Sequence, residues 1–208
     1  MELSKMYRLY DFLSSGNGYK IRLLLSQLKI PFDWIEVDIL REETRKSEFL
    51  TKNPNGRIPV LEISANQYLV ESNAILYYLS QNTSYFPHDS WYDAQVMQWL
   101  FFEQYSHEPY IATSRYWLII LNQPEEYQRE LEKKKQGGYH ALKIMEAHLQ
   151  TRTFFVNEQY TIADIALYAY THVAEEGGFN LRSFPSILSW LNRIEQKPDY
   201  VPITHRFS

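Results

Sequence analysis

The pattern of the sequence changes near Asn82, and this change restricts the chain to folds with two unlike parts. Before that point, short β-branched and aromatic runs alternate with helical periods in the order βαβ, a polar segment, then ββα. Beyond residue 90 nearly every segment has helical period. The turn-rich stretch TSYFPHDS joins the two parts. The sequence therefore predicts an α+β domain over residues 1–82, a linker at 83–90 and an all-helical domain over 91–208.

The second part divides into four helices. A stretch over 91–121 has helical period and is expected to bend near Pro109, since proline lacks the N–H that an interior position needs. A second helix should run from about residue 124, across Gly137 and Gly138, to about residue 150. A third follows Thr161, and a fourth begins at Pro185 and ends before Pro198.

Composition excludes several functional classes. The 208 residues include no cysteine, so disulfides, thiolate metal sites and an enzyme thiol as nucleophile are excluded. A net charge of −4 predicts no attraction to nucleic acid or anionic membranes. The N-terminus lacks the apolar core of a signal peptide and no apolar run approaches the roughly 18 residues of a membrane span, so we expect a cytoplasmic protein. Six dispersed histidines give no metal-binding spacing, and no metal is expected.

Three segments resemble those of one family. They are NPNGRIPVLE at 53–62, ESNAIL at 71–76 and TIADIALYAY at 161–170. Their sequence, order and spacing resemble the cytosolic glutathione transferases, and the likeness covers essentially the whole chain. It implies a thioredoxin-like βαβ-ββα lobe followed by an all-α domain, a homodimer, and glutathione as co-substrate without a tightly bound cofactor.

The turn SSGNGYK, residues 14–20, resembles the catalytic turn of serine-type transferases and of bacterial members that pair Thr or Ser with Asn. The resemblance implies that Ser15 is the catalytic hydroxyl and Asn17 its neighbour. Both precede a helix expected to begin near Gly18, whose unpaired N–H groups favour an anion. Taken from the residues alone, capping of the helix is the commoner role for residues such as Ser15 and Asn17. Tyrosine-type and cysteine-type catalytic residues are not matched.

Other segments imply the rest of a glutathione site. By the resemblance, Pro59 is cis and Ile58 offers its backbone to the cysteinyl part of the ligand. Glu71 and Ser72 suit the α-amino and α-carboxylate groups of the γ-glutamyl end, although the same pair would also serve as a helix cap beside an exposed carboxylate. The glycyl carboxylate needs a cation or amide, and four residues offer one: Arg41, Lys52, Asn55 and Arg57.

Two further groups lie in the helical part. The electrophile is expected between the lobes, facing a helix on which Glu103, His107, Tyr110 and Ser114 fall close to one face, although an aromatic stripe is more often packing. Thr161 and Asp164 form an S/T-x-x-acid capping box at the start of a helix. Its loss should lower the stability of the fold by about 0.5–2 kcal/mol.

The expected activity is the conjugation of glutathione, activated as thiolate, to small electrophiles. Two alternatives stay open: a glutathione-dependent reductase of disulfides or peroxides, and a non-catalytic protein of the same fold that binds a partner.

Overall fold

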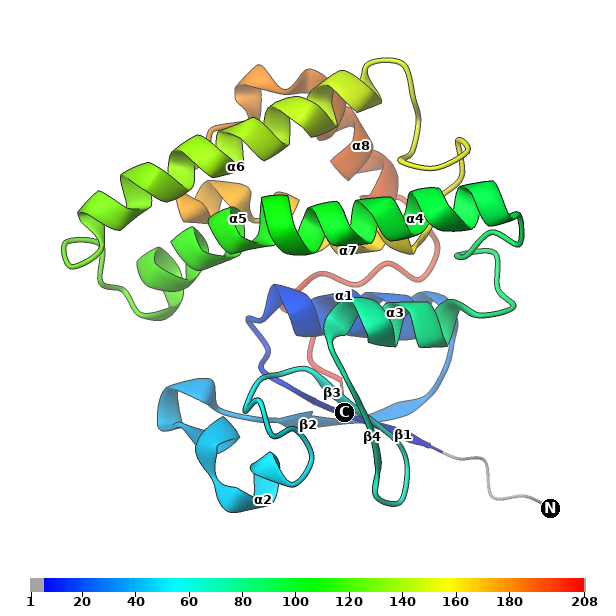
Figure 1. Cartoon of the computed structure of the whole chain (residues 1–208), viewed down its shortest axis with the longest axis vertical. Helices are drawn as coiled ribbons and strands as arrows, with labels where there is room; N and C mark the ends of the chain where they lie inside the picture. The colour runs from blue at the N-terminus through cyan, green and yellow to red at the C-terminus, as the bar shows by residue number, and fades with distance from the viewer. Residues whose placement is uncertain (1–5, 208) are drawn as a thin grey trace. The chain divides into compact units, whose positions relative to one another are not determined.

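The computed structural model describes residues 6–207, and the chain divides into two units. The first contains the described residues up to Leu79 and the C-terminal segment that begins at Pro198. The second runs from Ser80 to Lys197. The fold confirms the predicted architecture, a mixed α/β unit followed in sequence by a helical one (Figure 1).

A four-stranded sheet forms the centre of the first unit. Its strands are β1 (Tyr7–Asp11), β2 (Phe32–Glu36), β3 (Val60–Ser64) and β4 (Gln67–Val70), in the spatial order β2-β1-β3-β4. Strand β1 is parallel to β2 and antiparallel to β3, so that Leu9 lies opposite both Trp34 and Leu61. The strands β3 and β4 are antiparallel and form a hairpin, whose turn contains Asn66 with φ 60°. Leu9 and Leu61 are completely buried and belong to the core of the sheet.

Helices cover both faces of this sheet. Helices α1 (Gly16–Gln27) and α3 (Ser72–Ser80) lie on one face, and the short α2 (Ser47–Leu50) lies on the other (Figure 1). The segment before α2, predicted only as polar, contains two 3₁₀ turns, Ile39–Arg41 and Glu43–Arg45. The segment is held at both ends, because Val37 before it and Phe49 in α2 after it are buried with Val60 in a small apolar cluster.

The second unit consists of the predicted helices. The stretch predicted over 91–121 comprises α4 (Ser90–Phe102), a π-helical turn at Glu103–His107, α5 (Glu108–Arg115) and a second π-helical turn at Tyr116–Ile120. Pro109 occupies the first turn of α5, where its missing N–H costs little. The remaining helices are α6 (Gln128–Leu149), α7 (Ile162–Thr171) and α8 (Pro185–Glu195), with 3₁₀ turns at Ala174–Gly177 and Leu181–Ser183.

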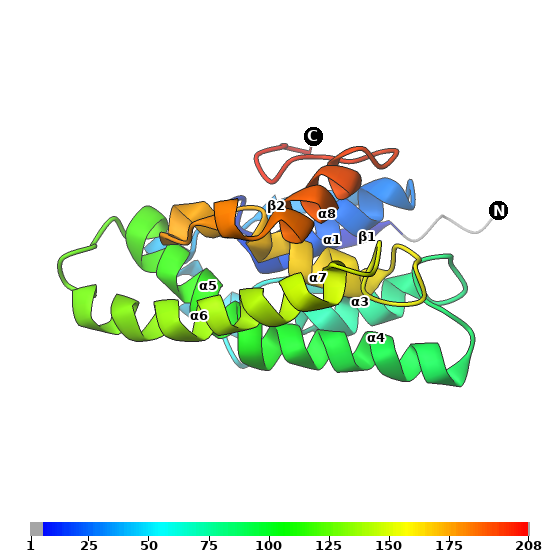
Figure 2. The same cartoon turned by 90° about the horizontal axis from the view of Figure 1, so that it is seen from above.

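Helix α7 lies among the other helices of the second unit (Figure 2). Every residue in it is buried, so it forms the core of that unit. The structure contains the capping box at its start: Asp164 accepts hydrogen bonds from Thr161 N at 2.9 Å and Thr161 Oγ1 at 3.2 Å. Asp164 also accepts from Phe155 N at 3.2 Å and from the Trp190 indole at 2.9 Å. The carboxylate thus connects α7 to α8 and to the preceding loop.

The C-terminal segment differs from the expected domain bounds. The prediction placed all of 91–208 in the helical domain, whereas residues 198–207 pack with the first unit. The Tyr19 hydroxyl donates to Val201 O at 2.7 Å, and the rings of Phe32 and Phe207 lie 4.8 Å apart. The segment has no helical or strand period after Pro198, so nothing in its own residues indicated which unit it would join.

Candidate functional site

Ser15 is the N-cap residue of α1. It has extended backbone (φ −74°, ψ 122°), and its hydroxyl oxygen accepts a hydrogen bond from Gly18 N at 3.2 Å. The helix begins at Gly16, slightly earlier than expected, and its first turn contains no acidic residue. The cap bond uses the oxygen as an acceptor, so the hydroxyl proton is still available for donation to an anion. The partial positive charge of the helix N-terminus favours such an anion by about 0.3–1 kcal/mol.

Asn17 and Ser72 join the starts of two helices. Ser72 begins α3 and is 5% exposed; its hydroxyl donates to Asn17 Oδ1 at 3.1 Å. The completely buried Lys20 donates from Nζ to Ser72 Oγ at 3.2 Å and to Asn73 Oδ1 at 3.3 Å. Ser72 is therefore fixed from both sides. Sequence reasoning missed Lys20, although a lysine three residues after Asn17 on the same helix could have indicated it.

Glu71 has an uncommon backbone conformation. Its φ is 69°, its side chain is exposed, and its carbonyl accepts from Ile75 N at 2.9 Å. Residues other than glycine rarely adopt positive φ, and such strain costs on the order of 1–3 kcal/mol and is concentrated at ligand sites. The strained residue therefore stands immediately before the predicted anion-binding helix start.

The loop before β3 contains the cis peptide bond Ile58–Pro59. Asn53, which is 4% exposed, holds this loop from inside: its Oδ1 accepts from Asn55 N at 3.0 Å and its Nδ2 donates to Arg57 O at 2.7 Å. Gly56 has φ 62°, which only glycine adopts without strain. Asn53 is a second residue that sequence reasoning passed over, and the sequence signal for it was an Asn directly before Pro54.

The residues considered for the glycyl carboxylate lie around this loop. The Lys52 ammonium lies 5.4 Å from the centre of the Tyr10 ring and 6.0 Å from that of Tyr68, with its side chain 12% exposed. Asn55 and Arg57 are exposed, and Arg41 pairs with Asp38 at 3.3 Å. Burial and the neighbouring Glu62 raise the pKa of Tyr10 to about 12, so this ring stays neutral under Lys52.

A buried ion pair lies below the turn that carries Ser15. Arg22 Nε donates to Asp11 Oδ2 at 3.0 Å, and both side chains are almost completely buried. Burial raises the pKa of Asp11 to about 7, although the Arg22 guanidinium opposes this rise. Gly18 lies so close to the Asp11 carboxylate that an added Cβ would overlap with it. Asp11 and Arg22 therefore determine how closely α1 approaches the end of β1.

Comparison with known proteins decides the family. The model of the glutathione S-transferase N-terminal domain matches residues 5–81, and that of the C-terminal domain matches residues 100–198. The chain belongs to the glutathione S-transferase family. A glutathione S-transferase from Pseudomonas fluorescens is 48% identical, with a TM-score of 0.94 over 96% of this chain and 100% of that one.

Two further members show the range of the family. The disulfide-bond oxidoreductase YfcG of Escherichia coli is 28% identical over 195 residues, covering 90% of this chain and 89% of its own. The structure of Ure2p in complex with S-p-nitrobenzylglutathione is 25% identical, with a TM-score of 0.85 over 96% of this chain and 94% of that one.

The structure places three of the four residues predicted to face the electrophile, His107, Tyr110 and Ser114, in different surroundings. His107 is completely buried, with Nε2 at 2.9 Å from Thr171 Oγ1, and the buried Ser114 donates to Tyr110 O at 2.8 Å. Tyr110 is half-buried, and Lys134 Nζ lies 5.6 Å from its ring centre. The hydrogen bonds of His107 and Ser114 lie inside the helical unit, so their contact with a substrate stays a prediction.

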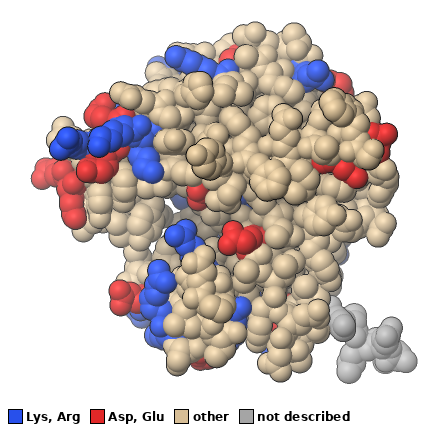
Figure 3. Space-filling model, in the orientation of Figure 1, with Lys and Arg blue, Asp and Glu red and all other residues tan. Residues whose placement is uncertain are grey.

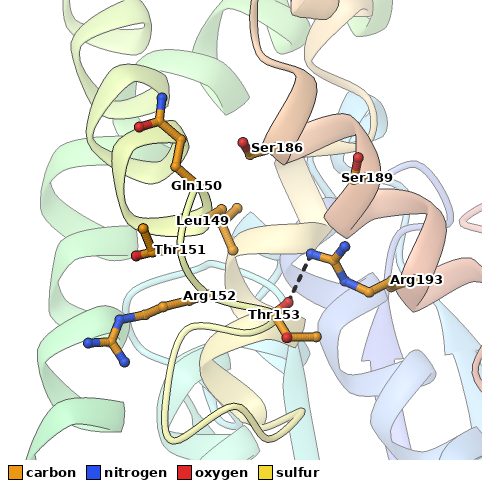
Figure 4. A pocket seen from close by; sticks show the side chains of 8 residues that line it. All are labelled: Leu149, Gln150, Thr151, Arg152, Thr153, Ser186, Ser189 and Arg193. Carbon is orange, nitrogen blue, oxygen red and sulfur yellow. Dashed lines mark hydrogen bonds between the residues drawn. The ribbon is translucent and has the colours of Figure 1, made fainter.

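A hollow of about 390 Å³ lies between the end of α6 and α8 (Figure 4). Arg193 lines it and donates to Thr153 O at 3.0 Å, whereas Arg152 points away from Arg193. The first N–H groups of α8 are already bound by Glu146, which accepts from Ser186 N and Ile187 N at 3.0 Å. Because these donors are used, the start of α8 does not offer them to an anion in the hollow.

Neither a metal-binding cluster nor a membrane-spanning helix is found among the residues that the structure describes. Among residues 6–207, no group of three His, Asp or Glu side chains could hold a metal ion. Within the same range no helix has the length and apolarity needed to cross a membrane. Basic and acidic side chains are intermixed at the start of α6, where Lys135 pairs with Glu132 at 3.8 Å (Figure 3).

Proposed function

We propose that this protein is a glutathione transferase that binds glutathione on its N-terminal unit, activates the thiol as thiolate, and conjugates it to small electrophiles. The observation that carries the proposal is the bond between Ser72 and Asn17, at 3.1 Å, beside the Ser15 cap. This bond brings the N-terminus of α3, with the Ser72 hydroxyl, next to the N-terminus of α1, with the Ser15 hydroxyl. A tripeptide with a thiolate on its central residue and a zwitterionic group at its γ-glutamyl end fits this arrangement.

The thiolate is the species that needs stabilisation. A glutathione thiol has a pKa near 8.5, so only a few per cent is ionised at pH 7. Lowering that pKa by about two units requires about 2.7 kcal/mol. One charge-assisted hydrogen bond from the Ser15 hydroxyl supplies about 1.5–3 kcal/mol, and the start of α1 adds to it. Ser15 acts as a donor and needs no base, and Asn17 is the second donor that we propose.

The other proposed contacts each bind one part of glutathione, from its γ-glutamyl end to its glycyl end. Ser72 and the start of α3 receive the γ-glutamyl carboxylate, and Glu71 receives its amino group. The backbone of Ile58, next to Pro59, pairs with the cysteinyl part. One of Lys52, Asn55 and Arg57 holds the glycyl carboxylate. The complex of Ure2p with a glutathione conjugate supports this class of ligand.

A second candidate function is the reduction of disulfides by bound glutathione. The resemblance of the Ser15–Asn17 turn to bacterial members that pair Thr or Ser with Asn favours it, together with the similarity to the oxidoreductase YfcG. In this reaction the bound thiolate attacks a disulfide sulfur, one thiolate leaves, and a mixed disulfide forms. A second glutathione thiolate then attacks the glutathione sulfur, which yields glutathione disulfide and the other thiol.

Calorimetric titration with glutathione tests the binding on which both functions depend. We expect saturable binding below millimolar ligand, and absence of binding there would refute both. Turnover should then be measured in parallel with an aryl halide, a hydroperoxide and a mixed disulfide. Conjugation of the aryl halide supports the transferase, whereas turnover confined to the mixed disulfide supports the reductase. Binding without any turnover favours a non-catalytic role in binding a partner.

We also propose that the protein is a cytoplasmic homodimer. Large aromatic side chains are exposed on α3, where Tyr77 and Tyr78 are 43% and 40% exposed, and on α4, where Trp91 and Phe101 are 69% and 67% exposed. Exposed aromatic side chains in such numbers are typical of interaction surfaces. Light scattering should give twice the chain mass of 24.9 kDa, and a monomer mass would refute the dimer.

A further inference from the structure

The C-terminal segment, residues 198–207, is bound along one side of α1. Three residues of that helix donate to its carbonyl oxygens: Tyr19 Oη to Val201 O at 2.7 Å, Arg22 Nη1 to Ile203 O at 2.9 Å, and Ser26 Oγ to Asp199 O at 2.9 Å. These positions follow the helical spacing i, i+3, i+7, so they share one face of α1. The segment is therefore held by the helix whose first turn contains the candidate thiolate site.

The end of the segment is held at a second place. Arg206 Nη1 pairs with Glu36 Oε2 at 3.1 Å, and the Phe207 ring packs against Phe32 at 4.8 Å between centres. Both partners belong to β2. Along the chain, the carbonyls of Ile203 and His205 thus lie between residues 199–201, which are bound to α1, and residues 206–207, which are bound to β2.

Arg22 connects this segment to the turn that carries Ser15. Beyond the bonds to Asp11 and Ile203, its Nη2 donates to Leu13 O at 2.6 Å and its Nη1 to His205 O at 3.4 Å. Leu13 is two residues before Ser15. The guanidinium is planar with its donors in a fixed fork, so its contacts with the tail determine where its contacts with the turn lie.

The turn that carries Ser15 is short, and contacts hold it at both of its ends. Ser15 N donates to Phe12 O at 2.8 Å, and Arg22 binds the next carbonyl, that of Leu13. At its far end Gly18 rests on the Asp11 carboxylate, which the same arginine holds. The position of Ser15 Oγ is therefore set by groups that Arg22 contacts directly.

We propose that the C-terminal segment is a positioning element of the thiolate site and acts through Arg22, a positioning residue. The inference rests on the proposed role of Ser15 as thiolate donor. When the carbonyls of Ile203 and His205 move away, the fork reorients and the Leu13 carbonyl follows. A displacement of Ser15 Oγ by a fraction of an ångström weakens a charge-assisted hydrogen bond and raises the pKa of the bound thiol. The γ-glutamyl contacts at Ser72 do not involve Arg22, so glutathione affinity is retained.

The test compares three full-length variants by two measurements: titration of the bound glutathione thiolate by its ultraviolet absorbance, and urea unfolding. Arg22→Lys keeps the charge beside Asp11 and loses the fork. The double variant Arg206→Ala/Phe207→Ala releases the end of the segment without changing a buried residue. Ser26→Ala is the matched control, because it removes a hydrogen bond to the segment at a position distant from Leu13.

For Arg22→Lys we expect the pKa of the bound thiol to rise by about one unit, from about 6.5 to about 7.5, which leaves about threefold less thiolate at pH 7, with glutathione affinity within several-fold. The double variant should shift this pKa in the same direction by less, and it remains informative even where Arg22→Lys does not fold. Ser26→Ala should lower stability slightly and leave the pKa unchanged. An unchanged thiol pKa in the double variant, or the same shift in Ser26→Ala, overturns the proposal. Absence of glutathione binding to the unmodified protein instead refutes the proposed function.

Discussion

Replacement of Asp164 by alanine should destabilise the helical unit more than loss of a helix cap would. A cap of this kind is worth about 0.5–2 kcal/mol. In the structure the Asp164 carboxylate accepts three N–H donors, from Thr161, Phe155 and Trp190, in addition to the Thr161 hydroxyl. All of these groups are buried, so the alanine variant leaves the three N–H donors without an acceptor.

The magnitude follows from two opposing contributions. Three orphaned donors cost about 1–3 kcal/mol each, or about 6 kcal/mol at the middle of that range. Burial raises the pKa of Asp164 to about 6 from its ordinary value of 3.8, despite the hydrogen bonds that oppose the rise. Keeping this carboxylate ionised above pH 6 therefore costs about 3 kcal/mol, which alanine recovers. The net loss at pH 8 is about 3 kcal/mol.

The same shift predicts how the loss depends on pH. Because the folded pKa lies above the unfolded one, the native state binds more protons between about pH 4 and 6, and wild-type stability rises as pH falls through that window. Asp164→Ala lacks this gain, so its deficit should be about 1 kcal/mol larger at pH 5 than at pH 8.

Urea unfolding followed by circular dichroism, at both pH values, measures these differences. Thr161→Ala is the matched control, since it removes the hydroxyl that accepts from Ala163 N at 3.3 Å, and it should cost about 1 kcal/mol. A deficit for Asp164→Ala no larger than that of the control, or one that shrinks at pH 5, would refute the reasoning.

Three further predictions concern the candidate site. Ser15→Ala should raise the pKa of the bound thiol and leave glutathione affinity within several-fold; an unchanged titration would assign the activation to Asn17 or to backbone N–H groups. Ser72→Ala removes one acceptor of Lys20 and the donor to Asn17, and should weaken glutathione binding about tenfold or more by calorimetry. Gly18→Ala should sharply lower the melting temperature, because its Cβ would overlap with the buried Asp11 carboxylate. A melting temperature equal to that of the parent protein would contradict this expectation.

The features that sequence predicted correctly are local ones. The order of strands and helices follows from periods of two and 3.6 residues, and the capping box at Thr161 is readable within four residues. The cis bond before Pro59 came from resemblance, because composition and spacing do not distinguish cis from trans.

The features that sequence missed depend on contacts between distant residues. Lys20 reaches Ser72 across 52 positions, and Arg22 reaches Ile203 across 181. Neither residue looks unusual in an amphipathic helix, where a lysine or arginine is expected to face solvent. The acceptors that make their burial possible become visible only in the folded chain.

The hydroxyl of Ser72 carries a single proton, and this limits what it can bind at one time. In the structure the proton is donated to Asn17, while Lys20 occupies a lone pair of the same oxygen. A carboxylate that accepts this proton necessarily ends the bond to Asn17. The glutathione-bound and free forms of the protein would then differ in the orientation of the Asn17 amide, although no helix or strand need move.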